Sequence, residues 1–113
     1  MTRNFNFPIL QLDGTSVKNE KGEDLTGTMA VTAALLANFP DEQNLGGEDR
    51  LKRFILAQRV HEAGALDTDV TVENLELIKR LVGKAYQTLV VGRVYVALEN
   101  DVRAVPVPTE AKA

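Results

Sequence analysis

Few residues in this chain carry side chains that could do chemistry, and none has the neighbours that an active site requires. His61 is the only histidine and stands beside Glu62, whereas a zinc site needs several strong ligands close together. We therefore interpret His61 as a structural histidine, at the surface or half-buried, and not as a metal ligand or a catalytic base. Tyr86 and Tyr95 fit an amphipathic role in a core or an interface better than a nucleophilic one.

Two other stretches could bind ions, but their residues argue against it. Residues 20–24 read as a solvated turn and lack the spacing and the terminal bidentate Glu of a calcium loop. The pair Gly46-Gly47 precedes a helix start that could bind an anion, yet Glu48 and Asp49 already occupy that positive end. The chain also lacks a P-loop, GxGxxG, GxSxG, HExxH and any Cys/His cluster. We therefore predict a protein that is not an enzyme and uses no cofactor and no metal.

Composition places the chain among small globular proteins. Its 113 residues fit one domain. Hydrophobic residues make up 44% of the chain but aromatic residues only 5%, so we expect a core of Leu, Val, Ile and Ala. A net charge of -3 is too mild to indicate nucleic-acid binding. Without cysteine, a signal peptide or a long apolar run, we expect a cytosolic protein with no membrane contact.

The densest apolar sequence begins with a helix start at Thr71. Thr71 has the position of an N-cap, and Val70 and Leu75 have the spacing of a hydrophobic staple. The apolar residues that follow cover most of the helical circumference, so this helix should be largely buried. Gly83 marks either close packing or the end of the helix, and the sequence leaves both open.

Residues 88–99 carry conflicting signals. Their β-branched content favours a buried strand, whereas Val91, Val94, Tyr95 and Leu98 fall at helical spacing after a possible N-cap at Thr88. We predict a helix and keep the strand as the alternative. Residues 101–113 contain two prolines and little apolar surface, which predicts a flexible tail after a single domain of residues 1–100.

Near the N-terminus, the pattern predicts a β-hairpin. Residues 5–12 alternate loosely between apolar and polar and lead into Asp13-Gly14, a dipeptide typical of tight hairpin turns. Pro8 cannot donate a ladder hydrogen bond, so this strand should lie at an edge. That edge is either closed within the molecule or open to a partner, and in the second case Ile9 and Leu12 would contact the partner.

Two helices are expected between the hairpin and Thr71. Thr26 or Thr28 can cap a short helix that ends before Pro40, and a charged helix over residues 48–63 stops at Gly64. The second helix has two apolar stripes on roughly opposite sides, one formed by Leu51, Phe54 and Ile55 and the other by Leu56, Val60 and Ala63. Either the helix is sandwiched inside the domain or one stripe faces another subunit. We favour a subunit contact through Leu56, Val60 and Ala63.

Three segments in order, LDGTSVKNEKGEDLT, GEDRLKRFILAQRVHEAG and VENLELIKRLVGKAYQTLVVGRVYVALE, resemble small proteins of unassigned function encoded in tailed bacteriophages and prophages. The resemblance covers roughly residues 8–99, and its motifs are compositional rather than catalytic. It implies a bacterial cytoplasmic setting, with virion association left open, and a protein that acts through binding.

We therefore expect an α+β fold that is mainly helical, with an N-terminal β-hairpin followed by about four helices. The expected function is that of a non-enzymatic phage accessory protein in head or tail assembly, which binds phage structural proteins and forms homo-oligomers. The alternative is an inhibitor of a host defence or regulatory protein, which would bind through the acidic loops at residues 20–24 and 41–49.

Overall fold

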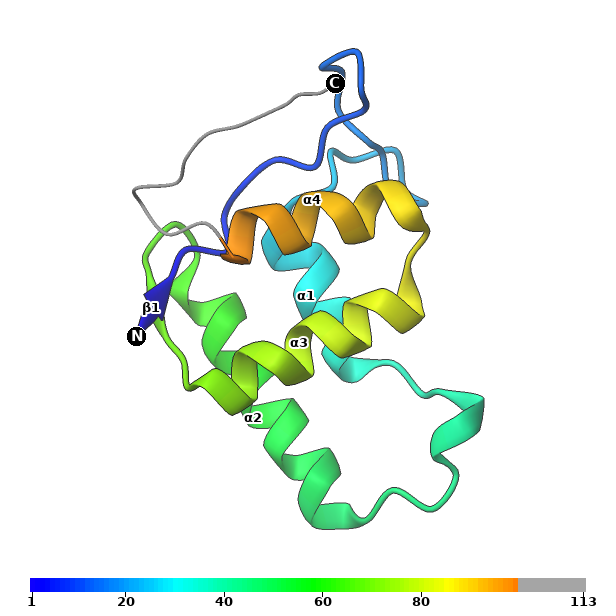
Figure 1. Ribbon diagram of the computed structural model, residues 1–113, viewed down its shortest axis with the longest axis vertical. Helices are drawn as coiled ribbons and strands as arrows, with labels where there is room; N and C mark the ends of the chain where they lie inside the picture. The colour runs from blue at the N-terminus through cyan, green and yellow to red at the C-terminus, as the bar shows by residue number, and fades with distance from the viewer. Residues whose placement is uncertain (100–113) are drawn as a thin grey trace.

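The computed structural model describes residues 1–99, which form four α-helices, a single 3-10 turn and a two-stranded antiparallel sheet (Figure 1). The elements are β1 (Thr2–Arg3), α1 (Gly27–Leu36), η1 (Pro40–Glu42), α2 (Gly47–Ala63), β2 (Thr68–Asp69), α3 (Val72–Ala85) and α4 (Thr88–Glu99). The fold is α+β and mainly helical, with an N-terminal β-hairpin ahead of four helices, as the sequence predicted. The predicted boundary at residue 100 and the tail at 101–113 lie outside the described residues.

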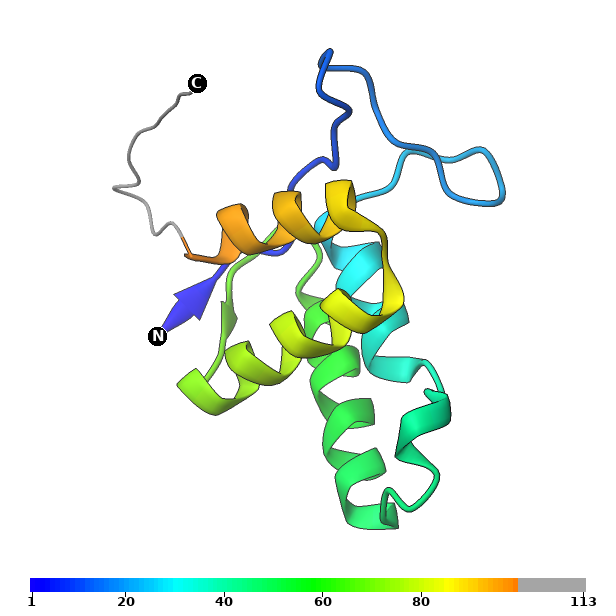
Figure 2. The same cartoon turned by 45° about the vertical axis from the view of Figure 1, so that its right-hand side comes forward.

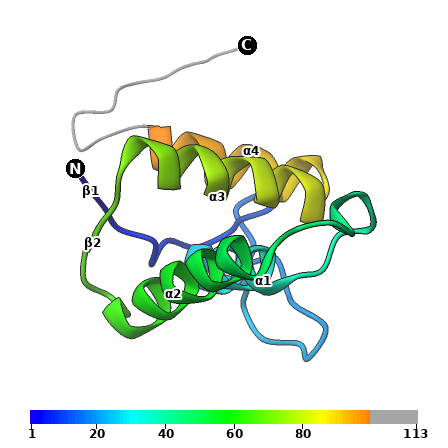
Figure 3. The same cartoon turned by 90° about the horizontal axis from the view of Figure 1, so that it is seen from below.

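The helices form two layers around one core. Helices α3 and α4 lie in one layer and α1 and α2 in the other (Figure 3). Helix α1 contacts both α2 and α3, so it is the central element of the packing. It can take this place because most of its buried side chains are small or β-branched, with Ala30, Val31 and Ala34 at 1% exposure or less and only Leu35 larger.

The predicted turn at Asp13-Gly14 is present. Gln11 N–H donates to the carbonyl of Thr15 (2.7 Å), and Gly14 adopts a φ of 91°, which glycine accepts without strain. The strands on either side meet only at an isolated bridge between Leu10 and Ser16, so the hairpin is short.

A second turn brings a third extended segment against the hairpin. Ile9 N–H donates to the carbonyl of Leu25 (3.1 Å), Val17 N–H to Ile9 (2.9 Å) and Leu25 N–H to Val17 (2.8 Å), which closes a ring of backbone hydrogen bonds. The edge at Pro8 is thereby covered by Thr26 of the same chain. Ile9 has no exposed surface, so the prediction that Ile9 contacts a partner is wrong. Its amide and carbonyl are both bonded inside the chain.

Helix α1 begins where the sequence placed it. The Thr26 hydroxyl accepts a hydrogen bond from the N–H of Met29 (3.3 Å), which makes Thr26, and not Thr28, the N-cap. Gly27 follows, and a Cβ there would lie 2.4 Å from the carbonyl oxygen of Phe5 and from the ring of Phe7. The start of α1 can therefore pack on the N-terminal segment only because residue 27 is glycine.

Helix α3 is capped by Thr71, whose hydroxyl accepts from the N–H of Asn74 (3.0 Å). Gly83 lies inside α3, and a Cβ there would lie 3.4 Å from the hydroxyl of Tyr95. That hydroxyl donates to the carbonyl of Lys79 (2.9 Å) and joins α4 to α3. Of the two interpretations of Gly83, close packing is the one that the structure supports.

Residues 88–99 form a helix, as predicted, and not a strand. The buried positions of α4 are Val90, Val94 and Leu98, spaced by one helical turn each. The N-terminal segment closes the far end of this helix, because the guanidinium of Arg3 donates from Nε to the carbonyl of Leu98 (2.7 Å). Sheet pairing of Thr2 with Asp69 holds this segment in place.

Leu98→Ala should lower the free energy of unfolding by about 2 to 5 kcal/mol, because it removes a fully buried side chain and leaves a cavity. Val96→Ala is the matched control, because Val96 lies on the same helix and is 60% exposed. This substitution should change the free energy of unfolding by no more than about 0.5 kcal/mol. Urea denaturation of the two variants measures the difference. Equal losses would show that α4 does not pack as described.

Candidate protein-interaction surface

Of the two apolar stripes of α2, one is buried in the structure and the other is exposed. Leu56 and Val60 are 3% and 1% exposed and belong to the core, so the prediction that they face another subunit is wrong. Ala63 is only partly buried at the last turn of α2. The buried side of α2 also includes Arg53 and Ala57, which gives the i, i+3, i+4, i+7 spacing of a core-facing helix.

The other stripe is the exposed one. Leu51, Phe54 and Ile55 keep 55%, 52% and 42% of their surface accessible, although all three are large and apolar. They lie on the N-terminal half of α2, which extends beyond α3 and α4 (Figure 2). A contiguous set of large apolar side chains on one helix face is typical of a protein-binding surface.

A groove of about 310 Å³ continues this surface onto α1. Leu36 at the C-terminal end of α1 and Phe54 of α2 line it, together with the buried Ala57. His61 lies at the exposed side of this groove, in the last turn of α2. The residues that line this groove are mostly apolar or uncharged, and His61 is the one side chain among them that can carry a charge.

A buried ion pair fixes the orientation of α2. The guanidinium of Arg53 donates to both carboxylate oxygens of Glu42, at 2.7 Å and 2.8 Å. Lys84 of α3 adds contacts to Glu42 (3.2 Å) and to Asp41 (3.0 Å). The bidentate bond from Arg53 lowers the pKa of Glu42 to about 2. Because Arg53 points inward, the side of α2 that carries Leu51 and Ile55 points outward.

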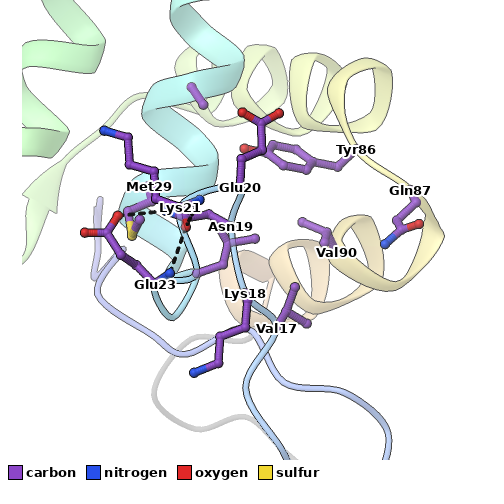
Figure 4. Close-up of a pocket in the computed structure, with 12 residues that line it drawn as sticks. Val17, Lys18, Asn19, Glu20, Lys21, Glu23, Met29, Tyr86, Gln87 and Val90 are labelled. Atoms are coloured by element: carbon purple, nitrogen blue, oxygen red, sulfur yellow. Dashed lines mark hydrogen bonds between the residues drawn. The ribbon is translucent and has the colours of Figure 1, made fainter.

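A second groove, of about 520 Å³, lies elsewhere, between the second turn and the start of α4 (Figure 4). Val17, Met29 and Val90 line its apolar part, and Tyr86 lies at one side with its hydroxyl toward Glu20. Burial and the charge of Glu20 raise the pKa of Tyr86, so the phenol stays protonated at neutral pH. Tyr86 is therefore not poised as a nucleophile.

The Asn19 side chain at the rim of this second groove is engaged within the turn itself. The Asn19 side chain accepts from the N–H groups of Lys21 and Glu23 (both 2.9 Å) and donates to the Glu23 carboxylate (3.0 Å). These bonds close the turn and do not converge on a point in the groove (Figure 4). The arrangement accounts for the turn without a ligand.

The acidic loops considered for a host partner also bind their own chain. Asp24 pairs with Lys18, and Asp41 and Glu42 contact Lys84. These contacts partly neutralise the negative charge that such a partner would recognise.

Other sequence candidates are placed apart from the α1–α2 surface. Leu12 is 89% exposed at the tip of the hairpin. Tyr95 is partly buried, and its hydroxyl joins α4 to α3 by a hydrogen bond to the carbonyl of Lys79.

Within residues 1–99, no three His, Cys, Asp or Glu side chains lie close enough together to hold a metal ion. The helices of this part of the chain are all too short or too polar to cross a membrane.

Comparison of the chain with protein-family models, with curated proteins and with solved structures finds no match in any of the three.

The stability of the domain should depend on pH through Glu42. Its pKa is lowered in the folded state, so the ionised group stabilises the fold above about pH 5, and this contribution disappears as the pH falls toward about 2. At neutral pH, Glu42→Gln should cost about 3 kcal/mol, because Arg53 is left buried without its counter-charge. Urea denaturation of both proteins across this pH range should show the difference shrink with acidification. A difference independent of pH would contradict the role of the ion pair.

Val60→Glu should unfold the domain, because it buries a carboxylate without a partner, and should lower the free energy of unfolding by about 3 kcal/mol or more. Ile55→Glu, five residues away on the exposed side of the same helix, should leave the helical content and the urea midpoint nearly unchanged. Circular dichroism with urea titration compares the two. A folded and stable Val60→Glu protein would show that the buried side of α2 has been assigned wrongly.

Proposed function

We propose that this protein acts by binding other proteins, without catalysis, as an accessory protein in the assembly of a phage or prophage head or tail. The observation that carries the proposal is the exposed apolar face of Leu51, Phe54 and Ile55, with the adjoining groove at Leu36. Within residues 1–99, the core contains 19 buried hydrophobic residues, and none of these four is among them. The virion setting rests on the resemblance of the sequence to small proteins of tailed phages.

Binding through this face is favoured over binding through the hairpin edge. The edge expected at Pro8 is paired with Thr26, whereas the face on α2 remains accessible along more than one helical turn. Phe54 lines the groove at Leu36 and also a smaller hollow of about 90 Å³ beside Leu45, so it is the residue at which a partner should be captured. Aromatic side chains at such positions commonly dominate binding energy.

A photo-crosslinking phenylalanine analogue placed at position 54 tests the proposal in cells that are producing the virion. The expected product is a covalent complex with a head or tail protein, because the partner must lie against the ring. The same analogue at the exposed Val96 of α4 is the matched control and should give no such product. Crosslinks from position 54 to host proteins alone would favour the inhibitor of a host protein, and equal crosslinking from both positions would refute the assigned surface.

A further inference from the structure

The outer face of α2 has charges arranged to fit a second copy of itself. This face, here called the α2 outer face, is defined by Glu48, Leu51, Ile55 and Arg59, all exposed. The exposed Lys52 lies at its edge, and the exposed Glu62 follows Arg59 toward the end of the helix. Glu48 and Arg59 are eleven residues apart, which is about three helical turns, so they lie on the same side of the helix at its two ends. The apolar pair of Leu51 and Ile55 lies between them. An acid, an apolar centre and a base therefore follow one another along one face.

We infer that the α2 outer face binds a second copy of this chain, with the two α2 helices antiparallel about a two-fold axis. If the axis passes between residues 53 and 54, Glu48 of each copy lies opposite Arg59 of the other, since 48 and 59 are equally far from that point. The symmetry produces this ion pair twice. The inference rests on the proposed function, and it names one partner of the same surface.

The same register brings the apolar residues together. Leu51 of one copy and Ile55 of the other fall within one residue of each other along the axis, about 1.5 Å. Their side chains, now 55% and 42% exposed, would cover each other twice across the two-fold axis. Phe54 and Leu36 lie beside this contact, where they can extend it. The contact therefore has an apolar centre with charged pairs at its ends, as protein interfaces commonly do.

Other arrangements of two copies fit less well. A parallel pairing would put Glu48 against Glu48 and Arg59 against Arg59, which repel. In the antiparallel pairing, Lys52 of the two copies comes near the axis, but its long side chain can extend sideways and keep the ammonium group in water. The guanidinium of Arg59 is available for a partner, because its bond to the carbonyl of Asp69 is long, at 3.4 Å, and uses one of its donors.

The expected dimer is weak. Helix α2 has 17 residues and is therefore about 26 Å long, so a contact through one face of it lies at the small end of specific interfaces. Self-association should accordingly depend on concentration, with monomer at low and dimer at high concentration.

Charge reversal tests both the partner and the register. Sedimentation of the full chain over a range of concentrations should show a monomer–dimer equilibrium. Arg59→Glu and Glu48→Arg should each weaken it by about tenfold or more, because each places like charges opposite one another at both ends. The double variant, which exchanges the two charges, should restore the wild-type affinity. Ile55→Glu should abolish the dimer, whereas Leu12→Glu, on the exposed hairpin tip, should leave it unchanged.

Two outcomes would overturn the inference. The first is a wild-type monomer up to the solubility limit, and the second is a double variant as weak as either single variant. Circular dichroism of each variant excludes unfolding as the cause of a lost dimer. These results are independent of the proposed function, because crosslinks from position 54 to a virion protein would support that function even if the chain is monomeric. Conversely, a dimer with no virion crosslinks would support self-association alone.

Discussion

The structure depends most on the buried pairing of Arg53 with Glu42. Arg53 takes a core-facing position in α2, where an unpaired charge would be very costly, and the bidentate bond to Glu42 removes that cost. The pairing also holds η1 against α2, and Lys84 extends it to α3. Three elements separated along the chain are therefore fixed in rotation relative to one another. The outward direction of Leu51 and Ile55 is a consequence of this constraint.

The N-terminal segment completes the helical layers rather than forming a separate sheet. The ring of backbone hydrogen bonds among Ile9, Val17 and Leu25 gives each of these residues a place in the core without a long strand. Nearer the N-terminus, Arg3 donates to the carbonyl of Leu98 at the end of α4, and Thr2 pairs with Asp69 of β2. The first residues of the chain thus connect the link between α2 and α3 with the end of α4, and these contacts fix a segment that otherwise has only isolated bridges.

The surface that this packing leaves free is chemically simple. It has apolar side chains from α1 and α2, one histidine and charged residues of both signs along α2. Such a surface can recognise shape, apolar area and charge, which are the properties that govern association between proteins. The groove near Tyr86 differs, because the Asn19 side chain at its rim is bonded within the turn and the phenol of Tyr86 remains protonated at neutral pH.

Local signals in the sequence determined the elements of this protein. The hydroxyls of Thr26 and Thr71 cap helices, Asp13-Gly14 forms a turn, and the turn-by-turn spacing of apolar residues made residues 88–99 a helix despite their β-branched content. Only the tertiary structure decided which side of α2 is buried. Both sides carry apolar residues, and the inward side contains an arginine whose partner lies eleven residues away in η1, within the loop between α1 and α2. Sequence periodicity counts such an arginine as a surface residue, because the neutralising contact with Glu42 arises only when the loop folds back on the helix.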